Sequence, residues 1–255
     1  MAITYVGAQA AGILGTISAQ TISFTSLTGG SDAAPAVGDL VIVTWCTGTI
    51  GNDRDLTITN ASAVDYTLLG TEKFANDSYD LNMRTAYRVM PDPVETQVIL
   101  SCSAGGTGST QDAGAYSITV FRGVHATPLE QAVQEGTAIN THIVNPGGIT
   151  PTTVGTVVYV AGCGVSDAGI AVYTSSDLTD FRSVTGDDNQ DVVLGSGYFP
   201  WTSGAFNPAT FGGGGTDTAN HSYGWIIAAL APADSSGLSH ILSGKFGGLL
   251  KGKLG

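Results

Sequence analysis

Two acidic residues, Glu130 and Glu135, are the first candidates for chemistry, because sugar hydrolysis needs a pair of carboxyl groups that flank the glycosidic bond. β-Sheet enzymes of this class carry their acids at alternate positions of one strand, on one face. Glu130 and Glu135 are five residues apart, so in an extended strand their side chains point to opposite faces. The spacing therefore predicts ordinary surface acids.

Serine and histidine chemistry has little support in the sequence. Residues 195–197 read Gly-Ser-Gly and lack the outer glycine spacing of the nucleophile elbow of hydrolases. The four histidines are isolated from one another: His125, His142, His221 and His240. Their spacing predicts neither a serine triad nor a metal triad. We therefore predict that the protein is not an enzyme.

Two segments contain oxygen ligands that suit calcium. Residues 212–217 (Gly-Gly-Gly-Gly-Thr-Asp) match the start of the calcium β-roll repeat, but the motif occurs once and that fold needs tandem copies. Residues 186–191 contain Asp187, Asp188 and Asp191, without the spacing of an EF-hand loop. We predict a flexible glycine loop and a solvated turn, and no bound metal.

The cysteines and the N-terminus both indicate a reducing cytoplasm as the place of synthesis. Cys46, Cys102 and Cys163 form no Cys-x-x-Cys pair, so we expect free thiols, with neither a disulfide nor a cofactor. The N-terminal residues lack the basic region and apolar core of a secretory signal. No run of about 20 apolar residues could cross a membrane. These features predict no membrane partner.

The charge of the chain is unevenly distributed. Nine basic and 21 acidic residues give a net charge of −12. Lys245, Lys251 and Lys253 follow the last acidic residue, Asp234, so six basic and 21 acidic residues give residues 1–234 a charge of −15 and leave +3 for the tail. An acidic body repels phosphate backbones, which predicts no nucleic-acid partner.

Aromatic residues gather in one late segment. Tyr198, Phe199, Trp201, Phe206 and Phe211 lie near glycine-rich turns. Loop aromatics of this kind commonly plug the open end of a β-sandwich. The alternative is an exposed platform on which a sugar or a protein partner stacks.

All of these residues must be positioned by β-strands. Glycine and proline, 36 and 9 of 255 residues, punctuate short β-branched and aromatic runs, a pattern typical of strands and turns. Residues 39–45, 156–161 and 224–230 are nearly continuous apolar runs, which predicts central strands covered on both faces. Other runs, such as residues 83–89, alternate apolar and polar positions. The pattern predicts an all-β protein with two packed antiparallel sheets.

An internal repeat supports a two-part layout. Residues 37–46 and 154–163 share the pattern Val-Gly-x-apolar-Val-x-Val-x-x-Cys, each after a proline-containing loop. Residues 116–118 are matched later by residues 223–226. The two interleaved halves of a jelly roll would explain the repeat. Chance similarity between apolar strands is the alternative.

Several segments resemble a group of virion proteins of tailed phages and prophages. They are residues 3–7 (Ile-Thr-Tyr-Val-Gly), 27–43, 66–69, 87–90, 120–124 (Val-Phe-Arg-Gly-Val), 128–129 and 225–230. The resemblance extends over most of residues 1–232. It implies a concanavalin-like jelly-roll sandwich that serves as a structural or surface-displayed component of the virion. These segments are strand and turn signatures, so they indicate architecture more directly than role.

The C-terminal segment departs from the strand pattern. Residues 231–237 read as a strand stop and a linker, which divides the chain into a sandwich domain, residues 1–234, and a docking tail, residues 235–255. Apolar tail residues recur at three- and four-residue steps: Leu238, Ile241, Leu242, Phe246, Leu249 and Leu250. This spacing predicts a short helix, which the tail glycines weaken. We predict that these six residues dock the tail on a neighbouring subunit or another virion protein, where the charge of Lys245, Lys251 and Lys253 suits an acidic groove; a terminus without a function is the alternative.

Taken together, the sequence predicts an all-β, jelly-roll sandwich that is a structural virion protein of a tailed phage. We expect it on the particle exterior, as a capsid decoration or accessory protein. Its predicted partners are other virion proteins and copies of itself, because charged residues make up only 12% of the chain and leave surfaces suited to subunit contacts. The alternative is a tail-associated, lectin-like module that binds a host surface glycan.

Overall fold

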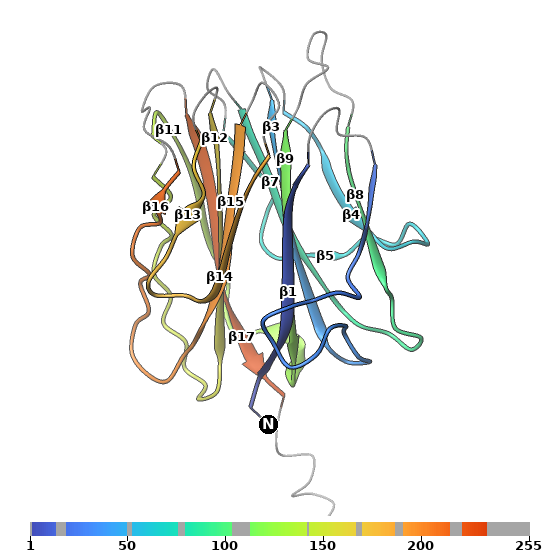
Figure 1. Cartoon of the computed structure of the whole chain (residues 1–255). Coiled ribbons are helices and arrows are strands. Elements are labelled where there is room, and N and C mark those ends of the chain that lie inside the picture. The colour runs from blue at the N-terminus through green and yellow to red at the C-terminus, as the bar shows by residue number, and fades with distance from the viewer. Residues whose placement is uncertain are drawn as a thin grey trace, which may run out of the picture.

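A computed structural model describes residues 2–13, 19–49, 53–75, 80–103, 113–141, 143–166, 170–186, 191–214 and 221–233. Every regular element within these residues is a β-strand (Figure 1). The prediction of an all-β protein is therefore confirmed.

The first half of the chain forms one six-stranded antiparallel sheet. Its strand order is β1-β9-β3-β7-β5, and β6 also pairs with β7. The strands are β1 (Thr4–Ile13), β3 (Leu40–Thr49), β5 (Thr67–Leu68), β6 (Lys73–Ala75), β7 (Asp80–Val89) and β9 (Gly114–Arg122). The central strands β3 and β7 pair along their whole length, from Leu40 opposite Val89 to Thr49 opposite Asp80.

The second half forms a second six-stranded antiparallel sheet. Its strand order is β10-β17-β12-β15-β14, and β11 also pairs with β17. The strands are β10 (Val124–Leu129), β11 (Gln134–Ile139), β12 (Val157–Ser166), β14 (Thr179–Gly186), β15 (Asp191–Pro200) and β17 (Ser222–Pro232). The two sheets pack face to face, which confirms the predicted β-sandwich (Figure 1).

The sequence repeat is a structural repeat. β1, β9, β3 and β7 of the first sheet correspond in order to β10, β17, β12 and β15 of the second. The repeated Val-Gly to Cys pattern leads into β3 and β12, which occupy the same place in the two sheets. The sequence match between residues 116–118 and 223–226 is displaced by two residues in the structure. Trp45 of β3 pairs with Tyr116, and Gly162, which occupies the position of Trp45 in β12, pairs with Trp225. Trp225, rather than Tyr223, is therefore the counterpart of Tyr116.

The two halves do not interleave as the jelly-roll interpretation of the repeat predicts. The first sheet is built from strands within residues 4–122, and the second from strands within residues 124–232. The chain passes between the sheets at Gly123, which separates β9 from β10 and has a φ of 78°. Within each half, the first strand pairs with the last, β1 with β9 and β10 with β17, so each half completes its own sheet.

The core between the sheets is built from the inward faces of β3 and β12. Every residue of these two strands is buried. Cys46 and Cys163 lie in this core, and burial raises the pKa of the Cys163 thiol. The hydroxyl groups of Thr44 and Tyr159 are hydrogen-bonded at 2.8 Å, which links the two sheets at their centre.

Further layers cover the outward faces of the sandwich, as the continuous apolar runs predict. The first sheet packs against a three-stranded sheet formed by β2 (Gln20–Ser23), β8 (Gln97–Cys102) and β4 (Leu56–Thr59). The second sheet packs against loops and against the short pair β13 (Tyr173–Thr174) and β16 (Gly212–Gly213).

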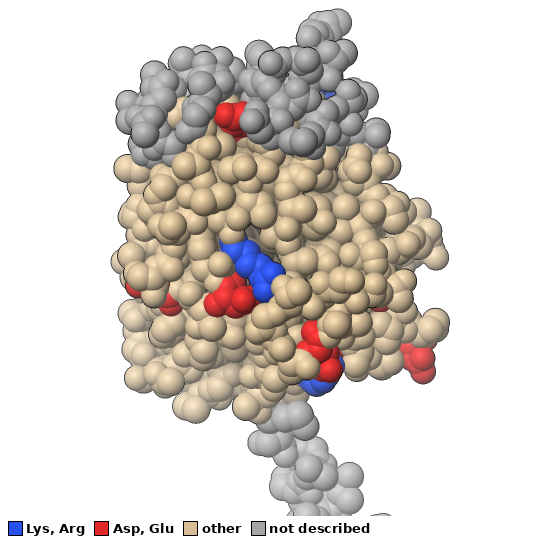
Figure 2. All heavy atoms as spheres, in the orientation of Figure 1, with Lys and Arg blue, Asp and Glu red and all other residues tan. Residues whose placement is uncertain are grey.

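One pair of sheet edges is closed by tight backbone contact. A Cβ atom on Gly12 of β1 would lie 1.9 Å from the carbonyl oxygen of Thr185 on β14, so a larger residue does not fit. Nearby, Arg182 pairs with Asp180 at 2.9 Å and donates to the carbonyl oxygen of Thr28 at 2.7 Å. Figure 2 shows how sparse charged side chains are on this face, where basic and acidic atoms lie side by side.

Candidate functional site

The two ends of the described chain meet at one end of the sandwich. The amide of Ala233 donates to the carbonyl oxygen of Gly123 at 2.7 Å. A Cβ atom on Gly123 would lie 2.9 Å from the carbonyl oxygen of Ala2. Figure 1 shows the N-terminus beside the end of β17. We call this part of the molecule the terminal end.

An ion-pair cluster fixes the loop at the terminal end. The Arg122 guanidinium, at the end of β9, donates from Nε and Nη2 to the two carboxylate oxygens of Asp39, both at 2.9 Å. Its Nη1 donates to Asp32 at 2.9 Å. Asp39 is only 1% exposed and also accepts from the amide of Ala36 at 2.7 Å. Hydrogen bonds to Asp39 and then to Asp32 raise the pKa of Arg122, so the guanidinium stays charged.

Two exposed valines lie at the same end. Val37 and Val154 occupy equivalent positions of the repeat, and 58% and 81% of their surfaces are exposed. Each precedes a glycine with positive φ, Gly38 at 82° and Gly155 at 91°, a conformation that favours glycine in tight turns. These turns lead into β3 and β12, whose first residues pair with the last residues of β9 and β17. The terminal end therefore presents apolar side chains to solvent.

Glu130, the first of the two acids considered for catalysis, holds a loop in place. Its carboxylate accepts hydrogen bonds from the amides of Thr152 and Thr153, both at 2.7 Å, and from the hydroxyl of Thr156 at 2.9 Å. Burial raises the pKa of Glu130, but these hydrogen bonds to the ionised form outweigh burial, and the pKa is lowered.

Glu135, the second acid, links the two sheets. Its carboxylate lies 2.7 Å from Nζ of Lys73 on β6 and accepts from the hydroxyl of Thr71 at 2.8 Å. Burial raises the pKa of Glu135, but the hydrogen bonds from Lys73 and Thr71 lower it by more. The net pKa is lowered, so the group stays ionised. Each acid is therefore engaged by its own neighbours, Glu130 by residues 152–156 and Glu135 by Lys73 and Thr71.

The structure brings together one serine and one histidine that sequence reasoning leaves apart. Oγ of Ser166, at the end of β12, is hydrogen-bonded to Nε2 of His221. Both residues are buried, with 2% and 1% exposed, and Asp191 lies opposite Ser166 on β15. Serine and histidine in contact can act as nucleophile and base, but this pair is enclosed and serves to join neighbouring strands. The contact could have been inferred from strand pairing, because His221 directly precedes β17, and β17 pairs with β12, which ends at Ser166.

The late aromatic residues cover the outer face of the second sheet. Trp201, Phe206 and Phe211 are buried, with 7%, 8% and 2% exposed. Phe206 stacks on Phe199 with ring centroids 4.2 Å apart, and Tyr198 packs against the core between the sheets. The alternative of an exposed stacking platform is therefore wrong for these residues. They are buried as the plug interpretation expects, although they lie on a sheet face rather than at its open end.

Other predicted positions fall outside the described residues. These are Asp187, Asp188, residues 215–217 and the six apolar tail residues. Asp191 is described, and its carboxylate accepts from the amide of Ile170 at 3.5 Å. Within the described ranges, no group of three or more His, Cys, Asp and Glu side chains could hold a metal ion.

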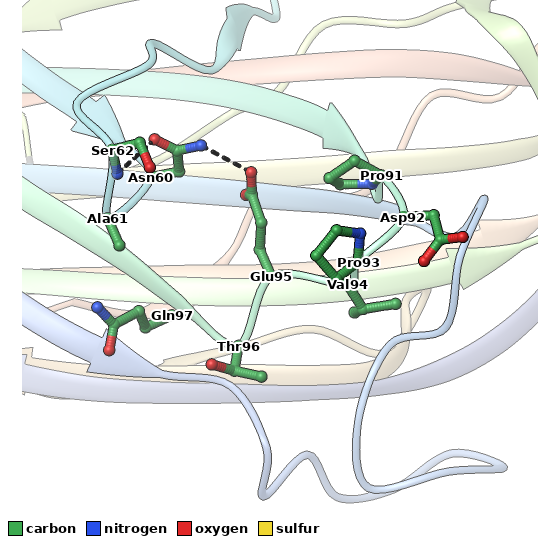
Figure 3. A pocket seen from close by; sticks show the side chains of 10 residues that line it. All are labelled: Asn60, Ala61, Ser62, Pro91, Asp92, Pro93, Val94, Glu95, Thr96 and Gln97. Carbon is green, nitrogen blue, oxygen red and sulfur yellow. Dashed lines mark hydrogen bonds between the residues drawn. The ribbon is translucent and has the colours of Figure 1, made fainter.

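A pocket of about 510 Å³ opens beside β4 and β8. The turn of residues 60–62 forms one wall and the segment of residues 91–97 forms the other (Figure 3). Asn60 and Glu95 connect the two walls through a hydrogen bond of 2.7 Å. The sequence did not predict this pocket, because residues 60–62 and 91–97 match no known binding motif.

Comparison of the chain with protein-family models, curated proteins and solved structures gives no match. In the part of the chain that the structure describes, no helix is long and apolar enough to cross a membrane.

Proposed function

We propose that the protein is a structural component of a tailed-phage virion, displayed on the particle exterior as a capsid decoration or accessory protein. The observation that carries the proposal is that Ala2 and Ala233 both lie beside Gly123 at the terminal end. A body in which residues 2 and 233 lie at the same end can be attached at that end and project from the particle as a unit.

The resemblance to virion proteins supports the same role. Two of the resembling segments, residues 27–43 and 120–124, contain Asp32, Asp39 and Arg122. These three residues form the ion-pair cluster at the terminal end. The resembling residues therefore stabilise the terminal end, where Ala233 lies.

In this proposal, the C-terminal segment holds the protein on the particle. The contact with other virion proteins, or with copies of this chain, is made by Leu238, Ile241, Leu242, Phe246, Leu249 and Leu250. The exposed side chains of Val37 and Val154 lie at the same end and add apolar contact area. The acidic body repels nucleic acid, so the expected partners are proteins.

The test is retention on purified particles. Phage would be propagated with the full chain or with the double substitution Leu242→Asp and Phe246→Asp, and copies per particle would be counted by mass spectrometry. The matched control, Ser239→Asp with Ser243→Asp, adds the same charge to the same segment. We expect the first variant to fall by about tenfold or more and the control to load normally. Absence of the full chain from particles would overturn the proposal.

A second function, recognition of a host glycan at the tail, is favoured by the polar pocket beside β4 and β8. Copy number separates the two roles, because a decoration protein occurs in many copies on the head and a tail-tip module in few. Neither role needs catalysis, and we expect no hydrolytic activity from Glu130 and Glu135.

A further inference from the structure

The turn that forms one wall of the pocket is fixed by hydrogen bonds. Oδ1 of Asn60 accepts from the amides of Ser62 and Val64, both at 2.9 Å. Nδ2 of Asn60 donates to Oε1 of Glu95 at 2.7 Å, which ties the turn to the facing segment; Figure 3 shows the bonds to Ser62 and Glu95. These bonds join protein groups alone, so the pocket is formed before any ligand arrives. Preformed pockets bind with a smaller entropic cost.

The Glu95 carboxylate is held in place from the first sheet. Nε of Arg88 lies 2.8 Å from Oε1 of Glu95, and the hydroxyl of Tyr66 donates to Oε2 at 3.4 Å. The Arg88 guanidinium also lies over the Tyr66 ring, 5.8 Å from its centroid. Burial and then the charge of Glu95 raise the pKa of Tyr66, so its hydroxyl remains a donor. The charge of Glu95 is thus compensated by Arg88.

The remaining charge of the pocket disfavours anions. Asp92 lines the pocket, and no lysine or arginine of the described segments forms an ion pair with it. The pocket is therefore negative, on a chain whose net charge is −12. Phosphates and carboxylates are repelled by such a surface. The described residues around the pocket also lack a cluster of three metal-ligating side chains.

The lining combines hydrogen-bonding groups with small apolar surfaces. Hydroxyl, amide and carboxylate groups come from Ser62, Asp92, Thr96 and Gln97. Apolar contacts come from Pro91, Pro93 and Val94. A sugar ring has the matching surface, because it carries hydroxyl groups around its edge and C–H groups on its faces. The volume of about 510 Å³ lies in the range of small-molecule sites.

We propose that this pocket binds an uncharged, hydroxyl-rich ligand of monosaccharide size, either a free sugar or the terminal residue of a glycan. The inference rests on the pocket alone. It holds whether or not the protein is attached to a particle, so its test is separate from the test of particle retention.

The experiment measures binding of the full chain to a panel of sugars by saturation-transfer NMR and calorimetry. The panel contains glucose, galactose, mannose and N-acetylglucosamine, with glucuronate and inorganic phosphate as anionic probes. Ser62→Trp fills the pocket, and the Ser62 side chain is outside the hydrogen bonds that fix the turn. The matched control is Ser203→Trp, which places the same side chain at an exposed turn before β16. Circular dichroism checks that both variants fold.

We expect at least one neutral sugar to bind, with affinity reduced about tenfold or more by Ser62→Trp and unchanged by Ser203→Trp. Oligosaccharides ending in the same sugar distinguish the two sources. Binding of the free sugar alone assigns the ligand to a small metabolite, whereas tighter binding of the oligosaccharide assigns it to a glycan. Tighter binding of glucuronate or phosphate would overturn the ligand class. Binding that Ser62→Trp leaves intact, or no binding by the panel, would overturn the site.

Discussion

Asp39 and Asp32 bind the same guanidinium, yet replacing Asp39 by Asn should destabilise the protein much more than replacing Asp32 by Asn. Asp39 is 1% exposed and accepts two hydrogen bonds from Arg122 and one from Ala36. The Asp32 side chain is 48% exposed and accepts one hydrogen bond from Arg122. The pair therefore compares a buried and an exposed carboxylate on one partner.

The magnitudes follow from burial. Asp39→Asn removes the charge and replaces one accepting oxygen by an NH₂ group that faces another donor. A hydrogen bond to a charged group contributes about 1.5–3 kcal/mol, so we expect the free energy of unfolding to fall by about 2–3 kcal/mol. Asp32→Asn weakens an exposed ion pair, whose contribution is about 1 kcal/mol or less.

Urea unfolding followed by tryptophan fluorescence measures both values, provided that the denaturant slope is unchanged. Arg122→Ala supplies a double-mutant cycle, in which the cost of Asp39→Asn should shrink once the guanidinium is absent. Equal costs for the two Asn variants would refute the assignment of Asp39 as the buried anchor. An unchanged cost of Asp39→Asn in the Arg122→Ala background would refute the pairing itself.

Glu130→Gln should lower the melting temperature near neutral pH, because the folded pKa of Glu130 lies below its ordinary value of 4.5. That contribution is complete above the unfolded pKa and is lost as pH falls through the folded pKa. The difference in melting temperature between variant and parent should therefore shrink as pH falls below 4.5; a constant difference would contradict this. Gly12→Ala should cost about 1–3 kcal/mol or more in urea unfolding, because its Cβ would lie 1.9 Å from a backbone oxygen of β14. An unchanged midpoint would show that the sheet edges can separate. Cys102, which is partly exposed, should react first with a thiol reagent, and the buried Cys46 and Cys163 only on unfolding. Rapid modification of all three thiols in the native protein would contradict their burial.

Local patterns were sufficient for the strands. The apolar runs at residues 39–45 and 156–161 predicted strands covered on both faces, and β3 and β12 are buried throughout. The repeat at residues 37–46 and 154–163 predicted equivalent roles, which the matching strand orders confirm. Such patterns predict strands because side-chain alternation and turn glycines depend only on residues close together in the sequence.

Local patterns were not sufficient to predict whether the late aromatic residues are buried or exposed. Trp201, Phe206 and Phe211 are as compatible with a platform as with a covering layer. The difference depends on the outer face of the second sheet, where Val160 and Ile227 need an apolar cover. That face forms only when β12 and β17 pair, so the sequence around Trp201 cannot indicate that the aromatic residues cover it.

The sequence by itself determined the all-β class, the central strands, the repeat and the acidic body, since composition and periodicity act locally. Tertiary structure alone decided that each half completes its own sheet, and that Arg122 reaches Asp39 from 83 residues away. It also decided that Asn60 and Glu95 close a pocket across 35 residues. Contacts of this kind depend on sheet register and on the twist of packed strands, and these are set by the sum of many weak interactions rather than by any one segment.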